Sequence, residues 1–330
     1  MNVLFIGGTG TISTACTRLA VEQGIELYLF NRGQTSADLP AGVQLIQGDI
    51  NNRDEAAALL ADHTFDAVVD WIAFDVAQIE RDIELFSGRT GQYIFISSAS
   101  AYQKPVAHYR IDEGTPLANP YWEYSRKKIA CEERLMRQYR DHRFPITIVR
   151  PSHTYTPSRL PTAVGSGPNI VARLRAGKKV IVHGDGESLW VLTHNTDFAK
   201  ACNGLLAHPK AIGQAYQITS DEVLTWNQIY TILGQAAGAE PQLIHIPSDF
   251  INHHDPLTGA GLLGDKACSV VFDCAKIKEL VPDYVATVPF SKGARECVAW
   301  LDADPQRAQI DQEREEMMDH IIAAYQKAWN

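Results

Sequence analysis

The sequence has no long hydrophobic run, no surplus of basic residues and no Cys-x-x-Cys pair. Because no stretch of about 18 apolar residues occurs, we expect no membrane span. The apolar run over residues 3–6 follows no basic segment, which argues against a signal peptide. The 30 Lys and Arg against 39 Asp and Glu give a formal charge of -9, which argues against binding to a nucleic-acid backbone. These absences predict a cytoplasmic protein that binds neither membranes nor nucleic acids.

The cysteines and histidines give no sign of a metal centre. The six cysteines are scattered, so we expect free thiols in a reducing compartment. The nearest approach to a ligand cluster is His253-His254-Asp255, and adjacent residues rarely point to one metal ion. We therefore predict that the protein binds no metal.

The N-terminus combines a strand, a glycine-rich turn and a helix. Residues 2–6 form a short apolar run typical of a buried parallel strand, and Gly7-Gly8-Thr9-Gly10-Thr11-Ile12-Ser13 follows directly. Gly7 permits a tight turn, and Gly10 leaves room for a pyrophosphate at the helix N-terminus. The pattern predicts a dinucleotide site. The loop residues predicted to contact the cofactor are Gly7, Thr9, Gly10, Thr11 and Ile12.

The end of the second predicted strand, residues 25–30, bears on the choice of cofactor. Folds that bind NAD commonly place an acid there for the ribose 2′-hydroxyl, whereas this chain has Asn31 and then Arg32. An arginine can receive a 2′-phosphate, so NADP is slightly favoured over NAD. The alternative is that Arg32 points into solvent, or stacks on adenine while NAD is bound.

Strands alternate with helices along the first half of the chain, which predicts an α/β fold with a Rossmann-type doubly wound parallel sheet. Ligands of such folds lie outside the carboxyl ends of the strands. The cofactor is therefore expected to meet residues at these strand ends: Asp49, Ile50, Trp71, Ile72, Ser97 and Pro151.

Residues 1–152, with about 195–247, are predicted to form the NAD(P)-binding domain, and a helix over 225–237 with a strand over 243–246 completes its layer. Residues of about 153–194 and 248–330 are predicted to form a smaller substrate-binding lobe with a C-terminal helix. That helix, from about residue 305, carries an apolar stripe. A core-facing stripe is the default interpretation and a homodimer contact is the alternative. The stripe consists of Ile310, Met317, Ile321, Tyr325 and Trp329.

Tyr124 and Lys128 lie four residues apart on a long helix predicted over residues 121–141, so they share one helix face. A nearby ammonium favours the ionised phenol and lowers its pKa, which gives a proton donor and acceptor usable near neutral pH. The spacing alone is common. It gains weight because it follows a nucleotide loop and Ser98, which stands at the end of the strand predicted over residues 92–96.

Together the motifs resemble the extended short-chain dehydrogenase/reductase superfamily, in its NAD(P)-dependent epimerase/dehydratase family. The matching elements, over most of the chain, are Gly7-x-x-Gly10-x-x-Ser13, Asp49, Ser98 four residues before Tyr102, Tyr124-x-x-x-Lys128, Arg150-Pro151 and Asp197. The resemblance implies that Tyr124 is the general acid/base and that Ser98 hydrogen-bonds the reacting oxygen. It also implies that Lys128 holds the nicotinamide ribose and lowers the pKa of Tyr124, and that Asp49 meets the adenine.

Three departures from the family pattern bear on the reaction. Ser13 replaces the third glycine, where a small residue is tolerable. Ala99 and Ser100 stand where the dehydratases carry Asp-Glu, which argues against loss of water and for an epimerase or an oxidoreductase. Trp190 stands near the place of an arginine that grips the substrate diphosphate, which disfavours a nucleotide sugar. A tryptophan suits stacking on a sugar-like substrate, or it belongs to the core.

The candidate substrate residues are Ser100, His153, Trp190 and His194. The leading hypothesis is an NAD(P)-dependent epimerase or oxidoreductase that acts on a hydroxyl or keto group of a sugar-like small molecule. A non-catalytic nucleotide-sensing or RNA-associated relative is the alternative, since the chloroplast stem-loop-binding proteins are similar to this branch. The acidic charge and the intact Ser98, Tyr124 and Lys128 count against it.

Overall fold

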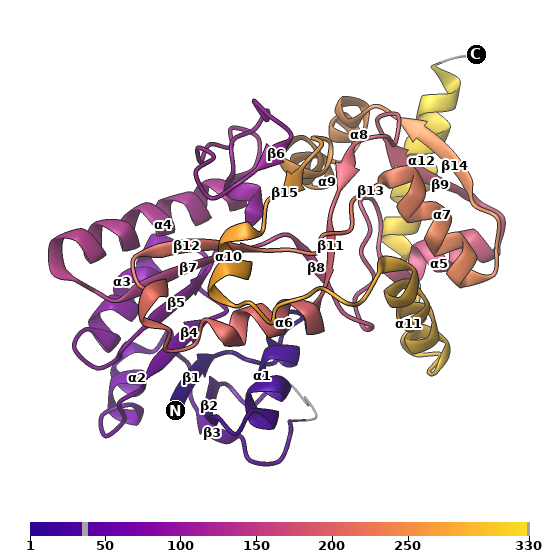
Figure 1. The fold of residues 1–330 in the computed structure, drawn as a ribbon. Coiled ribbons are helices and arrows are strands. Elements are labelled where there is room, and N and C mark those ends of the chain that lie inside the picture. The colour runs from indigo at the N-terminus through magenta and orange to yellow at the C-terminus, as the bar shows by residue number, and fades with distance from the viewer. Residues whose placement is uncertain (35–38, 329–330) are drawn as a thin grey trace.

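Seven parallel strands form the central sheet of the computed structural model, which describes residues 1–34 and 39–328 (Figure 1). Across the sheet the order is β3-β2-β1-β4-β5-β7-β12, and every neighbouring pair is parallel. The strands are β1 (Asn2–Ile6), β2 (Glu26–Asn31), β3 (Gln44–Gln47), β4 (Ala67–Asp70), β5 (Tyr93–Ile96), β7 (Ile146–Pro151) and β12 (Gln214–Ile218). The predicted Rossmann-type sheet is confirmed, and its winding reverses between β1 and β4, where such sheets bind ligands.

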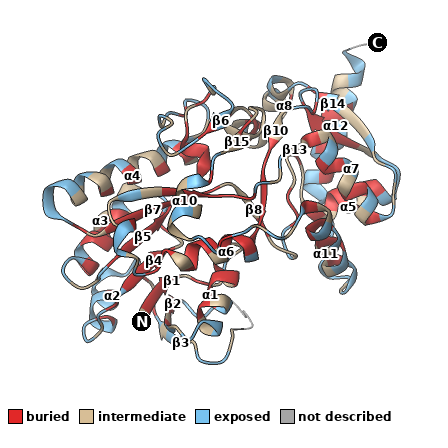
Figure 2. Ribbon diagram, viewed as in Figure 1, coloured by how far each residue is buried: buried red, intermediate tan, exposed pale blue. Residues whose placement is uncertain are grey.

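Helices cover both faces of the central sheet. They are α1 (Ser13–Glu22) and α6 (Asn195–Gly204) on one face, and α2 (Arg53–Leu59), α3 (Val76–Phe86) and α4 (Glu123–His142) on the other. Successive strand side chains point to opposite faces, so Val3 and Phe5 pack towards α1 whereas Leu4 and Ile6 pack towards α3. A sheet covered on both faces needs continuous apolar strands. The central strands β1, β4, β5 and β7 are buried (Figure 2), whereas the edge strand β3 is mostly exposed.

A smaller lobe lies to the right of the sheet in Figure 1. Its strands pair two by two: β8 (His153–Tyr155) with β11 (Leu192–His194), β9 (Lys179–His183) with β14 (Gln242–Ile246), and β10 (Leu189–Trp190) with β13 (Leu224–Thr225). Its helices are α5 (Gly167–Arg175), α7 (Trp226–Ala237), α8 (Ser248–His254), α9 (Pro256–Gly261), α11 (Phe290–Asp302) and α12 (Gln312–Lys327). The pair of β6 (Arg110–Ile111) with β15 (Val271–Phe272) lies above the sheet, and α10 (Ala275–Leu280) packs against β12.

The helix and strand expected over residues 225–246 belong to this lobe and not to the central sheet. β14 pairs with β9, and α7 buries Trp226, Tyr230 and Leu233 in the apolar core that α5 and α11 share. The predicted assignment of this segment to the Rossmann domain is therefore wrong. A helix with one apolar face and a short strand are compatible with either core, and only the long-range pairing with β9 decides between them.

The apolar stripe predicted on the last helix is only partly correct. α12 begins at Gln312 and buries Met318, Ile321 and Ile322, whereas Met317 is 37% and Ile310 47% exposed. The buried face thus contains Met318 rather than Met317, because Met318, Ile321 and Ile322 pack in the lobe core. The helix begins seven residues later than expected, so Ile310 precedes it. Trp329 lies outside the described residues. A homodimer contact remains a prediction.

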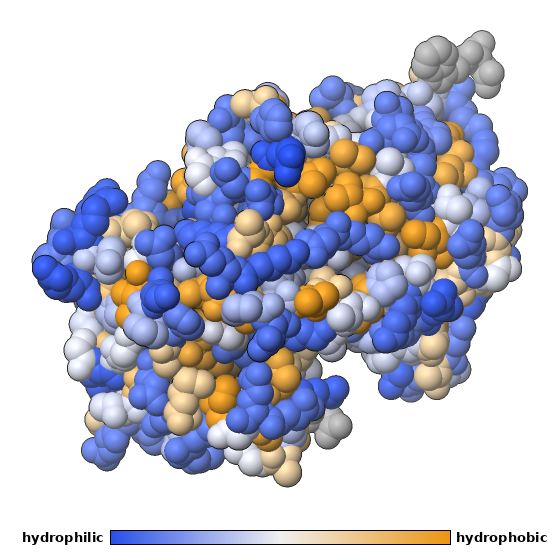
Figure 3. Space-filling model, in the orientation of Figure 1, coloured by the Kyte–Doolittle hydropathy of each residue, from blue (hydrophilic) through white to orange (hydrophobic). Residues whose placement is uncertain are grey.

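The surface is polar over most of the face shown in Figure 3. Apolar side chains gather where α9 and β13 lie in Figure 1, and Leu257 on α9 is a large hydrophobic residue that is 83% exposed. All six cysteines are free, as predicted. Within residues 1–34 and 39–328, no helix has the length and apolar composition needed to cross a membrane.

Candidate active site

The glycine-rich loop between β1 and α1 depends on backbone geometry that favours glycine. Gly7 and Gly8 have φ of 99° and 93°, in the region that L-residues rarely adopt. A Cβ on Gly8 would lie 2.6 Å from a methyl carbon of Leu29, and one on Gly7 would lie 3.1 Å from Ile72. The Gly7 N–H donates to the Phe30 carbonyl oxygen at 2.9 Å. The loop is therefore held against the ends of β2 and β4, at the point where the sheet reverses its winding.

Ser13, which replaces the third glycine of the family pattern, binds the loop. Its buried hydroxyl accepts the Gly10 N–H at 2.8 Å, and the Thr14 hydroxyl donates to the Gly10 carbonyl oxygen at 2.7 Å. Deeper down, the Thr17 hydroxyl donates to the Gly8 carbonyl oxygen at 2.8 Å. The helix thus fixes the loop through three hydroxyl groups, and one of them accepts the N–H of Gly10.

The turn after β4 is shaped by the buried Asp70. Its carboxylate accepts the N–H groups of Ile72 at 2.6 Å and of Ala73 at 2.8 Å, and Arg81 lies 3.4 Å away. This turn carries Trp71, whose buried indole N–H has no hydrogen-bond partner among the described residues. Asp70 therefore positions both residues that were predicted here, Trp71 and Ile72.

The predicted adenine-side residues lie at the ends of β2 and β3 and do not line the cavity that holds Tyr124. Asn31 accepts the Gly33 N–H at 2.9 Å, and Asp49 accepts the N–H of Asn51 at 3.0 Å. Arg32 is exposed and forms no ion pair with another described residue.

Tyr124 lines a cavity of about 530 Å³ that brings together most of the residues predicted on the substrate and nicotinamide side. Those found in it are Thr11, Ile12, Trp71, Ser97, Ser98, Ser100, Tyr124, Lys128, Pro151, His153 and Trp190. They come from α1, β4, β5, α4, β7, β8 and β10 or the turns beside them. Segments far apart in the sequence therefore meet at one site beyond the carboxyl ends of the strands.

Lys128 is buried beneath Tyr124 but does not bind its phenol. The ammonium donates to the carbonyl oxygens of Ala73 and Ile96, both at 2.7 Å, and lies 5.9 Å from the centre of the Tyr124 ring. Burial lowers the pKa of Lys128 to about 8. For Tyr124, burial raises the pKa, the Ser98 hydroxyl lowers it less, and Asp265 raises it further. This direction is opposite to the one predicted from the Tyr-Lys spacing.

Ser98 ends a chain of three hydroxyl groups. Ser125 on α4 donates to the hydroxyl of Ser100 at 2.8 Å, and the Ser100 oxygen lies 2.9 Å from that of Ser98. Since Ser100 accepts the proton of Ser125, it can donate its own to Ser98, which also accepts the Ser100 N–H at 3.2 Å. The proton of Ser98 is then left for the cavity. Ser100 is buried at the cavity wall and supports Ser98, and its predicted contact with the substrate remains a prediction.

Ser97 belongs to a buried ion pair beneath the site. Its hydroxyl donates to Glu132, whose carboxylate also accepts Nη2 of Arg150 at 2.5 Å and Nε at 3.0 Å. The Arg150 guanidinium lies 4.9 Å from the centre of the Tyr102 ring. The pair therefore links the ends of β5 and β7 to α4, which carries Tyr124.

His153 and Trp190 form a hydrogen-bonded pair at the lobe side of the cavity. The Trp190 indole N–H donates to Nδ1 of His153 at 3.2 Å. Burial lowers the pKa of His153 to about 3, so its ring is neutral and must carry its proton on Nε2. Trp190 is 3% exposed and its ring lies 5.6 Å from that of Trp226. It therefore belongs largely to the lobe core and fixes the tautomer of His153.

The cavity also contains residues that were not predicted, among them Trp122, Arg159, Asp265 and Lys266. Trp122 precedes α4, and its ring lies 4.9 Å from that of Tyr124. Asp265 and Lys266 end a π-helical turn over Leu262–Lys266, a feature often found at functional sites. Trp122 could have been noticed two residues before Tyr124, but nothing in the sequence around residue 265 marks a site.

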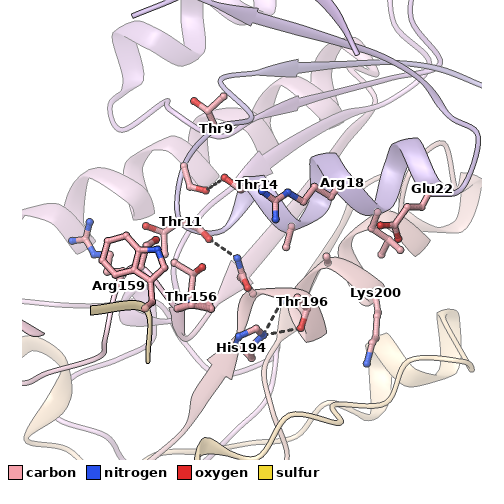
Figure 4. A pocket seen from close by; sticks show the side chains of 18 residues that line it. Thr9, Thr11, Thr14, Arg18, Glu22, Thr156, Arg159, His194, Thr196 and Lys200 are labelled. Carbon is pink, nitrogen blue, oxygen red and sulfur yellow. Dashed lines mark hydrogen bonds between the residues drawn. The ribbon is translucent and has the colours of Figure 1, made fainter. Parts of the chain in front are cut away.

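His194 lines a second cavity, of about 890 Å³, which also includes Thr9, Gly10 and Thr11 of the glycine-rich loop (Figure 4). Thr9 and Arg18 approach it from the loop and α1, and Lys200 from α6. His194 caps α6, because its Nδ1 accepts the N–H of Thr196 at 3.3 Å and lies 2.7 Å from the Thr196 hydroxyl. His194 is not among the residues that line the Tyr124 cavity, and a contact of His194 with the substrate remains a prediction.

Comparison with known proteins gives matches over most of the chain. The sequence profile of the NAD dependent epimerase/dehydratase family matches residues 3–219. 2'-Dehydrokanamycin reductase of Streptomyces kanamyceticus is 26% identical over 286 residues, which cover 86% of this chain and 80% of that protein. Chloroplast stem-loop binding protein of 41 kDa b of Arabidopsis thaliana is 26% identical over 265 residues, which cover 75% of this chain and 67% of that protein. The structure of dTDP-glucose 4,6-dehydratase from Bacillus anthracis in complex with NAD has a TM-score of 0.73 and 19% identity over 93% of this chain and 98% of that one.

The sheet order, the glycine-rich loop and the cavity around Tyr124 define a Rossmann-fold protein of the extended short-chain dehydrogenase/reductase type. The chain belongs to the NAD dependent epimerase/dehydratase family, whose profile covers residues 3–219. The resemblance inferred from the motifs is thereby confirmed. At 19% identity, the likeness to the dehydratase structure shows the fold alone.

Proposed function

We propose that the protein is an NAD(P)-dependent oxidoreductase or epimerase that acts on a hydroxyl or keto group of a sugar-like substrate. The observation that carries the proposal is that Ser98, Tyr124 and Lys128 line one cavity with Thr11 and Ile12 of the glycine-rich loop. The family supports it, as does the reductase activity named for the Streptomyces relative.

The residues around the cavity fit a nicotinamide dinucleotide. Gly7, Gly8 and Gly10 carry no side chain in the loop between the end of β1 and the N-terminus of α1, a place that favours a pyrophosphate. The unpartnered indole N–H of Trp71 offers a further donor. In this proposal Lys128 holds the nicotinamide ribose. The other proposed cofactor contacts are Gly7, Thr9, Gly10, Thr11, Ile12, Asn31, Arg32, Asp49, Ile50, Trp71, Ile72, Ser97 and Pro151.

Tyr124 would move the proton that accompanies hydride transfer. When bound, the nicotinamide accepts a hydride from the carbon of a secondary alcohol or returns it to a ketone. Because burial raises its pKa, the Tyr124 phenol is protonated at neutral pH and prepared to donate to the oxygen of a ketone. Ser98, whose proton is left for the cavity, would orient the same oxygen.

Loss of water from the substrate is disfavoured at this site. Ala99 and Ser100, at the places of the dehydratase acids, are both buried. Among the described residues that line the cavity, Asp265 is the one carboxylate, and Lys104 lies 3.7 Å from it. Elimination needs groups that remove and deliver protons, and the site offers no acid pair for this purpose.

We expect the purified protein to release its cofactor and to change the nicotinamide absorbance of added NADP or NAD in the presence of substrate. Ser13 occupies the Gly10 N–H, so the loop has one donor fewer for a pyrophosphate and should bind it reversibly. Gel filtration followed by absorbance measurement tests this result. Protein that retains nicotinamide through the column, and interconverts sugar epimers without added cofactor, would favour an epimerase instead.

Arg32→Ala is expected to lower the affinity for NADP by roughly tenfold or more and to leave the affinity for NAD nearly unchanged, because a charge-assisted bond to the 2′-phosphate is lost. Cofactor titration measures both. Arg53→Ala is the matched control, since Arg53 is an exposed arginine on α2 that pairs with Glu84. Equal losses for both cofactors would show that Arg32 does not read the 2′-position.

An RNA-associated protein is the second candidate, because the Arabidopsis stem-loop binding protein is 26% identical. The formal charge of -9 makes a phosphate-binding face unfavourable, and that function gives no reason for Ser98, Tyr124 and Lys128 to share a cavity. Retention of stem-loop RNA at physiological salt, with no turnover of any sugar, would reverse this order.

A further inference from the structure

The cavity around Tyr124 contains more positive than negative charge on its lobe side. Lys104 is 3% exposed and lies 3.7 Å from Asp265, so these two form an ion pair. Lys266, the next residue, forms no ion pair with any described Asp or Glu. Its ammonium lies 5.5 Å from the centre of the Trp122 ring and borders the cavity. Two ammonium groups therefore share one carboxylate, although Lys104 is not among the residues that line the cavity. Arg159 also lines it and forms no ion pair with a described Asp or Glu, so the surplus of positive charge includes a guanidinium.

Three side chains of the lobe hold the backbone of Lys266 in this place. Its carbonyl oxygen accepts three hydrogen bonds, from Nε2 of His183 at 3.0 Å and from Ser188 and Trp226 at 3.3 Å each. The π-helical turn before it is fixed to the segment that leads into α4, because Asn119 donates to the Gly264 carbonyl oxygen at 2.7 Å. The ammonium is thus carried by a rigid turn next to Tyr124.

An unpaired ammonium that is removed from water is unfavourable unless a partner supplies the opposite charge. Burial lowers the pKa of Lys266, because the charged ammonium is less stable there than in water. The pKa of His153 is lowered by burial and, to a smaller extent, by the charge of Lys266. His153 and Lys266 line the same cavity, and the neutral ring of His153 presents Nε2–H while its Nδ1 accepts from Trp190. The two side chains offer donors for which the described part of the chain supplies no hydrogen-bond acceptor.

We propose that Lys266, with Nε2–H of His153 as a second donor, binds an acidic group carried by the sugar-like substrate, either a carboxylate or a phosphate monoester. This inference rests on the proposed function and names the class of its substrate. An acidic group supplies the charge that Asp265 cannot, because Asp265 is already compensated by Lys104. A cationic amino sugar would meet a surplus of positive charge and is disfavoured.

Thermal unfolding of the cofactor-saturated protein with four probes tests the proposal: glucose, glucuronate, glucose 6-phosphate and glucosamine. We expect glucuronate or glucose 6-phosphate, but neither glucose nor glucosamine, to raise the melting temperature. Lys266→Met should abolish this gain, which corresponds to a roughly ten- to hundredfold loss of affinity, whereas Lys266→Arg should retain much of it. Which anion stabilises the protein distinguishes a carboxylate from a phosphate.

Three controls separate substrate binding from other roles of Lys266. Lys127→Met removes an exposed lysine of α4 that pairs with Glu123 and should change nothing. Without sugar, Lys266→Met should be at least as stable as the wild type, because an unpaired charge is removed. Its affinity for NAD and NADP should also be unchanged. The proposal is overturned if the wild type does not prefer the acidic sugars, if Lys266→Met keeps the preference, or if cofactor affinity falls instead. Binding is measured without turnover, so a failure of the proposed reaction leaves this result independent.

Discussion

Tyr124→Phe is expected to lower the turnover of the proposed reaction by roughly 10²–10⁴-fold, the range typical of a lost general acid or base. The substitution removes the phenol oxygen and keeps the ring, which lies between Trp122 at 4.9 Å and Phe74 at 6.1 Å. Packing is therefore conserved, and cofactor affinity and melting temperature should stay close to the wild type. Turnover with NADP or NAD, cofactor titration and thermal unfolding measure the three quantities.

Tyr121→Phe is the matched control for this experiment. Tyr121 is 44% exposed, stands just before α4 and does not line the cavity of Tyr124. Its phenol can be removed without loss of turnover. If Tyr124→Phe retained the wild-type rate, proton transfer would have to use another group of the cavity, and the catalytic role proposed for Tyr124 would be abandoned.

The parts of the site that could be predicted are those that neighbouring residues determine. The loop from Gly7 to Ile12 needs only its own glycines and the strand before it. Tyr124 and Lys128 share a face because the helix repeat places them there, and Ser98 follows a buried strand end. In a parallel sheet all strand ends meet at one edge, so these local signals were enough to predict a common site.

The pKa direction of Tyr124 could not be predicted from spacing. A helix places Lys128 one turn below the phenol, but it does not determine what else the ammonium binds or how much water reaches it. In the structure the ammonium donates to the Ala73 and Ile96 carbonyl oxygens, and burial outweighs the effect of Ser98 on the phenol. Both results depend on strands that the helix meets only after folding.

The site residues on the lobe side could not be predicted from the sequence for a related reason. Asp265 and Lys266 stand on a π-helical turn whose place beside Trp122 is set by Asn119 and by contacts with the lobe core. No periodicity or motif records such long-range contacts. Ser100 illustrates the same limit. Its position two residues after Ser98 does not predict that the hydroxyl of Ser125 on α4 donates to the hydroxyl of Ser100.

Glu132→Gln is expected to lower the free energy of unfolding by about 3–5 kcal/mol, because it leaves the buried Arg150 guanidinium without a counter-charge. The two side chains are 2% and 6% exposed and meet at 2.5 Å. Nη1 of Arg150 already has no hydrogen-bond partner among the described residues, so no spare acceptor is available to it. Gln has nearly the same size as Glu, and the loss therefore reports charge and not a cavity. Equilibrium unfolding in urea measures it.

The control for this prediction is Glu123→Gln on the same helix. Glu123 and Lys127 form an ion pair at 3.1 Å, but their side chains are 71% and 52% exposed. Water and salt therefore screen the pair, and the change in the free energy of unfolding should stay within about 0.5 kcal/mol.

Replacing both buried partners, as Glu132→Leu with Arg150→Met, should recover much of the stability lost in Glu132→Gln, because no unpaired charge remains. The same variant frees the hydroxyl of Ser97 from Glu132 and should weaken cofactor binding even where stability returns. If Glu132→Gln and Glu123→Gln were equally mild, the buried pair would not be what holds the ends of β5 and β7 to α4.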